Sequence, residues 1–494
     1  MTQPAIVPPS LADAERLRNF LTETGYTGGS ILKVLNANEL PSPRQLSASR
    51  MMRFVQEPTA LNALLRWFYL GLRIDRAKVT KIVPEWFVET ACASKILRIE
   101  GSELTPEVLL LPFENHWIAS DTNARFEACA PDFVVWPNTT TRFLHCFTVN
   151  RPSRATLDLG TGNGVQALSA TAYSERVVGT DLNPRAIEVA IFNARLNGIE
   201  GVEWLCGDAF EPVKRRKFDL IVSNPPFFIG PSNQFLFCDN SMDLDCLCGQ
   251  IARDAAAHLE EGGYFQMLCE WAEIEGESWQ ERLTGWFRGT GCDVWAVKGQ
   301  TRSVEQYSLD RLRELSVGDN LDAASYDAYA RYFSERKVTA IHNGVVAMRR
   351  RSGENWAVLE EASQFIERPF GELVLLRFAA HDFLSANTSA TEILSKRPLL
   401  LPHAVLEQVL HRAENGWETK SLFLKQTRGI PSSFGLQTPV AEFVGSFNGK
   451  RSLGELIRQL SANADASPEK VESQCIDLAR KLTAHGFIQW EQKV

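Results

Sequence analysis

The chain has 494 residues, which is too long for one ordinary domain because a single hydrophobic core stops growing at roughly 250 to 300 residues. Hydrophobic residues make up 44% of the sequence and charged residues 23%, proportions that exclude a disordered or collagen-like chain. The formal net charge of -8 gives no overall positive field toward nucleic acid, so an RNA site would need a local basic patch.

The sequence contains no signal-like start and no stretch of about 18 apolar residues, so we expect a cytoplasmic protein without a membrane segment. Its 10 cysteines form no CxxC pairs, and no HxxxH spacing accompanies them. This pattern indicates reduced thiols and predicts no metal site.

Residues 1–120 are predicted to form a helical, winged-helix-like domain. A helix is expected from Ser10, with Leu17, Phe20 and Leu21 on one face. Further helical patterns and two strand-like runs follow, namely helices at 59–72, 75–83 and 84–93 and strands at 95–99 and 103–111. Such a module reads nucleic acid in some proteins, whereas the acidic balance and apolar Trp and Phe residues favour plain packing.

Residues 121–365 change to strands alternating with helices, the pattern of a parallel sheet covered on both faces. This predicts an α/β domain with a Rossmann-like, seven-stranded sheet and a helical insertion at 303–337. The predicted strands are 156–159, 176–181, 203–206, 218–223, 264–269, 293–297 and 339–348.

Residues 366–494 are predicted to form a small α+β, winged-helix-like recognition domain. Ser452 is a favourable helix cap, and Ser467 followed by Pro468 is a typical helix start. A helix to Ala484 and a strand through 487–490 complete the expected unit.

A glycine-rich turn follows the first predicted strand of the central sheet. Glycines at alternate positions leave the backbone open for a ligand to lie against the turn, and the following helix presents free N–H groups. The predicted contact residues here are Asp158, Gly160, Gly162, Asn163 and Gly164. Taken alone, such a turn is also compatible with a tight strand-to-helix connection.

Acidic residues follow the next two strands. Asp181 comes about twenty residues after the glycines, where a carboxylate can accept both hydroxyls of a ribose. Asp208 and Ala209 follow the third strand, where the carboxylate can accept from an adenine amino group and Phe210 can cover the ring. Because the glycine spacing is G-x-G-x-G rather than the dinucleotide G-x-G-x-x-G, it favours S-adenosylmethionine over NAD.

The fourth strand ends in Ser223 and is followed by a polar, proline-rich motif, predicted to be catalytic and made of Asn224, Pro225, Pro226 and Phe227. An amide or aromatic amine nitrogen is a poor nucleophile because its lone pair is delocalised. The Asn224 side-chain oxygen and the Pro225 carbonyl can accept its two hydrogens and stabilise the charge that develops during attack on a methyl group. The prolines fix the backbone, and Phe227 can stack on a flat substrate.

These motifs together resemble the class I S-adenosylmethionine-dependent methyltransferases of the small-domain (MTS) family with an NPPY-type motif. The family includes release-factor glutamine methyltransferases and ribosomal RNA guanine-N2 methyltransferases. The resemblance implies that Gly160–Gly164 hold the methionine part, that Asp181 binds the ribose, that Asp208 contacts the adenine, and that Asn224, itself beside the cofactor, is the catalytic Asn. Residues 136–141 resemble the Pro-and-Thr loop that closes over the cofactor in the glutamine enzymes, without their acidic residue.

The expected function is N-methylation of a planar nitrogen, either a glutamine amide in a translation-associated protein or an exocyclic base amine in RNA. A short basic run, 214–217, could contact phosphate but is more typical of a solvated strand start. Two alternatives stay open: an NAD-dependent oxidoreductase, which leaves Asn224 to Phe227 unexplained, and a non-catalytic binding module with a vestigial cofactor site.

Overall fold

The computed structural model describes residues 6–45, 51–232, 234–315, 323–362, 370–414, 416–428, 430–462 and 466–490. The chain divides into two compact units. One comprises Met1–His145 and Arg151–Glu361, and the other comprises Cys146–Asn150 and Ala362–Val494. Residues 1–120 and most of the predicted 121–365 domain thus fall within one unit, and a domain boundary near residue 120 stays a prediction.

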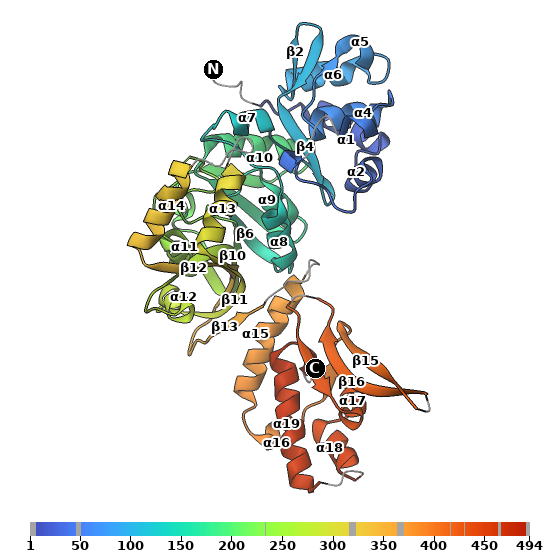
Figure 1. Ribbon diagram of the computed structural model, residues 1–494, viewed down its shortest axis with the longest axis vertical. Helices are drawn as coiled ribbons and strands as arrows, with labels where there is room; N and C mark the ends of the chain where they lie inside the picture. Colours follow the sequence, from blue (N-terminus) through green and yellow to red (C-terminus); the bar gives the residue numbers. More distant parts are fainter. Residues whose placement is uncertain are drawn as a thin grey trace. The chain divides into compact units, whose positions relative to one another are not determined.

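The first unit is built on an eight-stranded sheet (Figure 1). All seven predicted strands are present, most of them longer than expected, and β13 is an eighth strand that the apolar pattern did not predict. The strands are β6 (Ser153–Leu159), β7 (Ser174–Asp181), β8 (Val202–Cys206), β9 (Phe218–Ser223), β10 (Leu259–Ile274), β11 (Cys292–Ser303), β12 (Val338–Arg350) and β13 (Ala357–Glu361).

The strand order in the sheet is β13-β11-β12-β10-β9-β6-β7-β8. Strands β8, β7, β6, β9 and β10 run parallel, whereas β12 is antiparallel to both β10 and β11. The chain winds outward from β6 in one direction and then resumes at β9 in the other, so a topological switch point lies between these two strands. The predicted Rossmann-like fold is therefore confirmed.

Helices cover both faces of this sheet. The adjacent β7 residues Val177 and Val178 point to opposite faces because side chains alternate along a strand. Val177 packs in a cluster with α9, and Val178 packs in the cluster that includes α11 and α12. The helices around the sheet are α7 (Asn123–Glu127), α8 (Thr139–Phe147), α9 (Val165–Ala170), α10 (Pro184–Leu196), α11 (Cys246–Ala257) and α12 (Trp279–Phe287).

The predicted insertion contains two helices, α13 (Val304–Leu315) and α14 (Ala323–Glu335), which Figure 1 shows side by side. Their aromatic residues Tyr307, Tyr329 and Phe333 form a buried cluster with Ile229, which lies shortly after the proline-rich motif. The insertion therefore packs against the loop that follows β9.

The N-terminal elements share a core with α10. The predicted helix from Ser10 ends at Glu23, and a separate helix follows it. The predicted strand 103–111 is two strands, the second of which forms a hairpin. The elements are α1 (Leu11–Glu23), α2 (Gly28–Leu35), η1 (Pro43–Gln45), η2 (Met52–Phe54), α4 (Ala60–Leu64), η3 (Leu65–Tyr69), α5 (Arg76–Val79), α6 (Glu85–Ala93), β1 (Ile74–Asp75), β2 (Leu97–Glu100), β3 (Glu103–Pro106), β4 (Val108–Phe113) and β5 (His116–Asp121).

The second unit has its own core, formed mainly by α17, α18 and α19 with short strands. Ser452 and Ser467 cap their helices as predicted. The long hairpin of β15 and β16 was not predicted. The elements are α15 (Gly371–Ala386), α16 (Ala390–Leu394), β14 (Pro398–Leu400), β15 (Ala404–Ala413), β16 (Gly416–Gln426), β17 (Ser433–Leu436), α17 (Thr438–Gly445), α18 (Leu453–Ser461), α19 (Pro468–Ala484) and β18 (Ile488–Trp490).

None of the helices in the described ranges combines the length and the apolar character needed to cross a membrane.

Candidate active site

The four predicted site segments follow four neighbouring parallel strands in the order β8, β7, β6, β9. Leu159 of β6 pairs in register with Ser223 of β9, and Asp181 of β7 pairs with Cys206 of β8. The Ser223 hydroxyl also donates a hydrogen bond of 2.9 Å to the Leu159 carbonyl, which ties together the two strands at the switch point. The structure therefore brings all four segments to one edge of the sheet, where open α/β sheets bind ligands.

The glycine turn needs its glycines for two different reasons. Gly160, Gly162 and Gly164 have φ values of +74°, +54° and +85°, in the left-handed region that other residues disfavour. A Cβ atom on Gly160 or Gly162 would meet nothing within 4 Å. A Cβ atom on Gly164 would lie 2.9 Å from the Ala190 Cβ of α10. Two glycines thus leave open space at the turn, and the third permits close packing against a helix.

Asp158 lies beneath the turn and is 2% exposed. Its Oδ2 accepts hydrogen bonds from the Thr161 hydroxyl at 2.6 Å and from the Ala167 backbone N–H at 3.0 Å. Burial raises the pKa of Asp158 to about 6. The two hydrogen bonds lower this pKa, and the nearby Asp181 raises it. The carboxylate therefore shapes the turn from inside, and its contribution to ligand binding would be indirect.

Asn163 also supports the turn from within the protein. Its side-chain amide donates to the Val135 carbonyl at 2.9 Å, and its Oδ1 accepts from the Val165 N–H at 3.2 Å. Asn163 thus joins the glycine turn to the segment that precedes α8. Like Asp158, it was predicted as a cofactor contact, and the structure gives it a supporting position.

Asp181 is joined to the glycine turn through its own carboxylate. Its Oδ2 accepts from the Gly162 N–H and its Oδ1 from the Asn183 N–H, each at 2.8 Å. Burial raises the pKa of Asp181, and these two hydrogen bonds act in the opposite direction. The next residue, Leu182, is 55% exposed and places an apolar side chain beside the acid. Leu182 was not among the predicted site residues.

Asp208 lies exposed beyond the end of β8, and Ala209 has a left-handed φ of +43°. The Gly207 N–H donates to the Asp181 carbonyl at 2.9 Å, so this segment starts beside the acid at the end of β7. Phe210, which was expected to cover a ligand ring, is buried and stacks on His258 with ring centroids 4.6 Å apart, so one of its faces is occupied by protein. Its contact with a ligand stays a prediction.

Asn224 is held at one end of its side chain. Its amide nitrogen donates to the Thr140 hydroxyl at 3.3 Å. Its Oδ1 is buried and has no hydrogen-bond partner within the described part of the chain. An unpaired buried acceptor costs about 1–3 kcal/mol, so this oxygen is suited to a donor that arrives with a ligand.

The rest of the motif is fixed by packing. Pro225 is buried, and the Pro226 carbonyl accepts from the Asn240 side-chain amide at 2.9 Å. Phe227 is half-buried and meets Phe228 edge to face, with centroids 5.0 Å apart. The structure therefore places Phe227 close to Asn224 on a loop that is held by Thr140 at Asn224 and by Asn240 at Pro226.

Residues 136–141 lie against this motif, at the start of α8. Asn138 Oδ1 accepts from the Thr140 hydroxyl at 2.8 Å and from both the backbone N–H and the hydroxyl of Thr141 at 3.0 Å. The Gln166 side chain of α9 donates to the Thr141 carbonyl at 2.9 Å. This segment is thus connected to both the glycine-turn helix and Asn224. Its predicted role as a loop over the cofactor stays a prediction.

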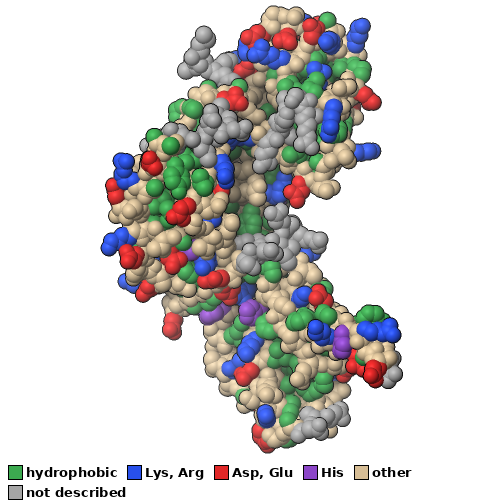
Figure 2. All heavy atoms as spheres, in the orientation of Figure 1, with side chains coloured by type: hydrophobic (Ala, Val, Ile, Leu, Met, Phe, Trp, Pro, Cys, Tyr) green, Lys and Arg blue, Asp and Glu red, His purple; other side chains and the backbone are tan. Residues whose placement is uncertain are grey.

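The basic run 214–217 lies at the opposite edge of the sheet, because it precedes β9 whereas Asn224 follows it. Arg216 forms a two-pronged ion pair with Glu203, and Lys214 pairs with Glu211. Figure 2 shows Lys and Arg side chains interspersed with Asp and Glu on the visible face, without a continuous basic stripe. The run is therefore a solvated strand start and not a phosphate contact beside Asn224.

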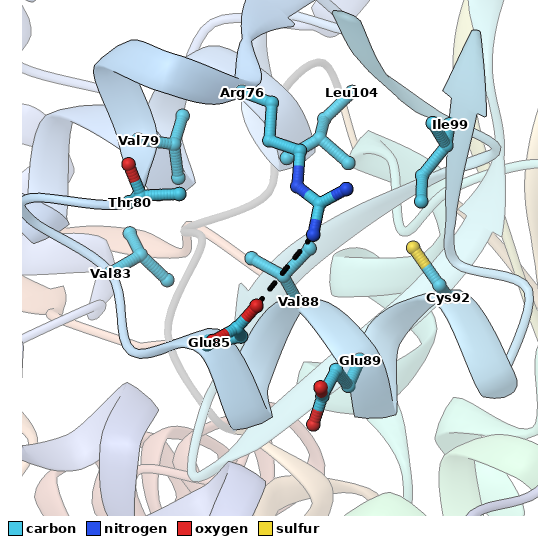
Figure 3. A pocket seen from close by; sticks show the side chains of 10 residues that line it. All are labelled: Arg76, Val79, Thr80, Val83, Glu85, Val88, Glu89, Cys92, Ile99 and Leu104. Atoms are coloured by element: carbon cyan, nitrogen blue, oxygen red, sulfur yellow. Dashed lines mark ion pairs between the residues drawn. The ribbon is translucent and has the colours of Figure 1, made fainter. Parts of the chain in front are cut away.

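A separate cavity of about 270 Å³ lies in the N-terminal region, between α5, α6 and the strands β2 and β3 (Figure 3). Aliphatic side chains such as Val79, Val88 and Leu104 line it, and Arg76 forms an ion pair of 3.7 Å with Glu85 beside it. The cavity contains none of the predicted site residues.

Comparison with known proteins places these segments in a family. Residues 137–273 match the family model described as methyltransferase small domain, and residues 377–489 match a domain of unknown function. The chain is 30% identical over 172 residues to a tRNA1(Val) (adenine(37)-N6)-methyltransferase of Actinobacillus pleuropneumoniae, a match that covers 33% of this chain and 72% of that enzyme.

The chain is also 43% identical over 81 residues to a release factor glutamine methyltransferase of Aliivibrio fischeri. That match covers 16% of this chain and 28% of that enzyme, so the chain spans little more than a quarter of this relative. Among solved structures, the YcgJ protein of Bacillus subtilis aligns with 16% identity and a TM-score of 0.30, over 44% of this chain and 100% of that one. The fold assignment here rests on the observed strand order and not on that low score.

The sheet order and the ordered strand-end motifs define a class I, Rossmann-like methyltransferase fold. The chain belongs to the methyltransferase small domain family.

Proposed function

We propose that the chain is an S-adenosylmethionine-dependent enzyme that methylates a planar nitrogen. The observation that carries this proposal is the unpaired, buried Oδ1 of Asn224 at the switch point, directly beside the glycine turn. A target N–H group would satisfy this acceptor. Neither a nicotinamide-dependent reaction nor plain turn formation requires an acceptor at that position.

The residues present fit the cofactor. Gly160 and Gly162 leave open space where the methionine part would lie, and the Asp181 carboxylate beside them would take the ribose hydroxyls. Asp208 and Ala209 would face the adenine, and the exposed Leu182 offers an apolar surface for a ring. The four strand ends span about 14 Å, at roughly 4.8 Å between neighbouring strands, which suits an extended nucleoside with an amino-acid tail.

The proposed roles in the reaction follow from these positions. When bound, S-adenosylmethionine supplies an electrophilic methyl group on a sulfonium. Asn224 Oδ1 and the Pro225 carbonyl accept the two target N–H groups and turn the nitrogen lone pair toward the methyl carbon, while Phe227 stacks on the flat acceptor. The cofactor would supply its methyl group to the nitrogen held by Asn224 and Pro225 and leave as the neutral sulfide, and the extra proton on that nitrogen would pass to water. The site thus contributes alignment and charge stabilisation, with no covalent intermediate on the protein.

Two acceptor classes fit this chemistry, and both stay within the proposal. A glutamine amide is the group that the release factor relative is named for, and an adenine amine is the group that the tRNA relative is named for. Both present a planar nitrogen with two hydrogens. The ion pairs of Lys214 and Arg216 and the mixed charges on the face seen in Figure 2 favour a protein acceptor. We place this reaction in the cytoplasm, where both acceptors reside.

Labelled methyl transfer tests this function. The full-length chain is incubated with methyl-tritiated S-adenosylmethionine and, separately, with purified release factor and with total tRNA. We expect label in one of these acceptors, removed by protease or by nuclease accordingly. Calorimetry accompanies the assay: binding of NAD without any response to S-adenosylhomocysteine would indicate an oxidoreductase. Binding of S-adenosylhomocysteine without transfer to either acceptor would indicate a binding module.

A further inference from the structure

The loop after the proline-rich motif is held by α13 of the helical insertion. The Tyr307 hydroxyl accepts the backbone N–H of Ile229 at 2.9 Å and donates to Glu270 Oε2 at 2.6 Å. Tyr307 is fully buried, and Glu270 is 2% exposed. Glu270 is paired in turn with Arg302, so the acceptor of the Tyr307 proton is itself fixed. This buried chain of bonds ends on the loop five residues after Asn224.

A second contact from α13 holds the aromatic part of the loop. The Arg311 guanidinium lies 3.4 Å from the centroid of the Phe228 ring, and Arg311 is 2% exposed. The guanidinium also lies 3.8 Å from the Cys238 sulfur and 3.9 Å from Asp239. Phe228 in turn meets Phe227 edge to face. A fixed Phe228 therefore limits the orientations that are open to Phe227.

Gly230, two residues after Phe228, packs closely against the insertion. A Cβ atom on Gly230 would lie 2.5 Å from the ring of Tyr329, which belongs to α14. Three successive residues, Phe228, Ile229 and Gly230, thus each meet a different side chain of the insertion. Pro225 and Pro226 have no N–H to donate, so the motif has fewer backbone hydrogen bonds available to fix it. The contacts of the three residues that follow it add to the bond from Asn240 to the Pro226 carbonyl.

We propose that Tyr307 and Arg311 are positioning residues for methyl transfer. They fix the loop so that the Asn224 acceptor and the Phe227 ring stay aligned with the target nitrogen. This inference rests on the proposed function. A misplacement of about 1 Å at a reacting centre costs on the order of a hundred-fold in rate, so a rigid support behind the motif has a direct consequence for turnover.

The variant Tyr307→Phe tests the first contact, because it keeps the ring and removes only the hydroxyl. We expect turnover to fall at least tenfold while the affinity for S-adenosylhomocysteine changes less than twofold. Amide hydrogen exchange at Ile229 should accelerate at least tenfold. The matched control is Tyr332→Phe on α14, whose hydroxyl accepts the N–H of Leu244 at 3.0 Å and not that of Ile229. This control should leave turnover and Ile229 exchange unchanged.

The variant Arg311→Lys tests the second contact, because it keeps the charge and loses the planar group over Phe228. Turnover should fall at least fivefold with unchanged S-adenosylhomocysteine affinity. Its control is Arg336→Lys, which removes a similar stack, 3.9 Å over Tyr332. Arg336 pairs with Asp243, farther along the same loop, and its ion pairs, hydrogen bonds and ring stack within the described part of the chain do not include Phe228, Ile229 or Gly230. Turnover of the control should match the wild-type value.

The outcomes separate this inference from the proposed function. If the wild-type chain labels neither release factor nor tRNA, the proposed function fails, and the positioning role fails with it. If the wild-type chain transfers methyl groups and Tyr307→Phe does so at the same rate, or with unchanged Ile229 exchange, only the inference is overturned. Equal losses in Tyr307→Phe and Tyr332→Phe would also overturn it, because they would indicate a general effect on folding.

Discussion

At the scale of single residues, some of the predicted site residues face open space at the strand ends, and others shape the turns around it. Asp158 illustrates the second kind, since both of its hydrogen bonds go to the glycine turn and the helix after it. A carboxylate in this position brings a charge into the core. The cost of that charge should appear in the pH dependence of stability.

We expect Asp158→Asn to become more stable relative to the wild-type chain as the pH rises. Burial raises the pKa of Asp158 from 3.8 to about 6, so the folded chain keeps a proton that the unfolded chain has released. The stability from this proton is present at low pH and is lost as the pH rises through about 6. Between pH 5 and pH 8 the wild-type chain loses about 1.4 kcal/mol of its free energy of unfolding, because pH 5 lies roughly one unit below the folded-state pKa.

Chemical denaturation of both chains at pH 5 and pH 8 measures this difference. The Asn side chain retains one oxygen in place of Oδ2, which accepts both hydrogen bonds in the wild-type chain. Ile221→Val is the control: it removes one methylene from the core and should cost about 0.5–1.5 kcal/mol equally at both pH values. A difference between Asp158→Asn and wild type that stays constant with pH would contradict the account.

At the scale of elements, strands with an apolar run were the easiest to predict, although β8, which has no buried residue, was predicted and the largely buried β5 was missed. β6 and β9 are apolar runs between polar turns, and this pattern predicted both strands. β13 has half-buried to exposed residues throughout, and β15 is exposed along most of its length. Neither carries the apolar signal on which sequence reasoning depends. β13 forms because β11 offers a free edge, a property of the assembled sheet.

The same limit applies to the site. The ends of successive strands were predictable, because parallel strands deliver their carboxyl ends to one edge. The bond from Asn224 to Thr140 joins residues 84 positions apart, and the bond from Tyr307 to Ile229 spans 78 positions. No local pattern encodes such contacts. The resemblance assigned residues 136–141 to a loop over the cofactor, and neither of these two contacts was predicted.

We expect Gly164→Ala to destabilise the chain more than Gly262→Ala does. Both glycines have positive φ values, +85° and +75°, so both substitutions incur about 1–2 kcal/mol of backbone strain. Only at Gly164 would the new methyl group also press against α10, at 2.9 Å from Ala190. This overpacking adds about 1–3 kcal/mol. Thermal or chemical unfolding of the two variants measures the difference. Equal losses in the free energy of unfolding would contradict the expectation and show that α10 shifts to accommodate the methyl group.

At the scale of the whole molecule, the predicted site residues all belong to one of the two compact units. The second unit has a separate core and matches a separate domain model. Among the described residues at the four strand ends, the predicted site residues include no Lys or Arg. We expect the regions that flank the sheet to select the acceptor.

We predict that a fragment of residues 1–361 retains affinity for S-adenosylhomocysteine and loses most methyl transfer to the native acceptor. The cofactor side of the site is complete in this fragment, whereas the predicted recognition domain is missing. Calorimetry and the tritium assay, with the full-length chain as the reference, measure the two properties. Transfer by the fragment at the full rate would show that the second unit has no part in acceptor selection.

The rate of methyl transfer at saturating S-adenosylmethionine, compared between the wild-type chain and Asn224→Ala, tests the proposed mechanism most directly. The variant removes the acceptor for the target N–H and loses only one protein hydrogen bond, to Thr140. Turnover should fall about a hundred- to a thousand-fold, as for other losses of one preorganised polar group, with little change in S-adenosylhomocysteine affinity. Methylation by Asn224→Ala at the wild-type rate would contradict the assigned role and reduce Asn224 to a turn residue held by its prolines.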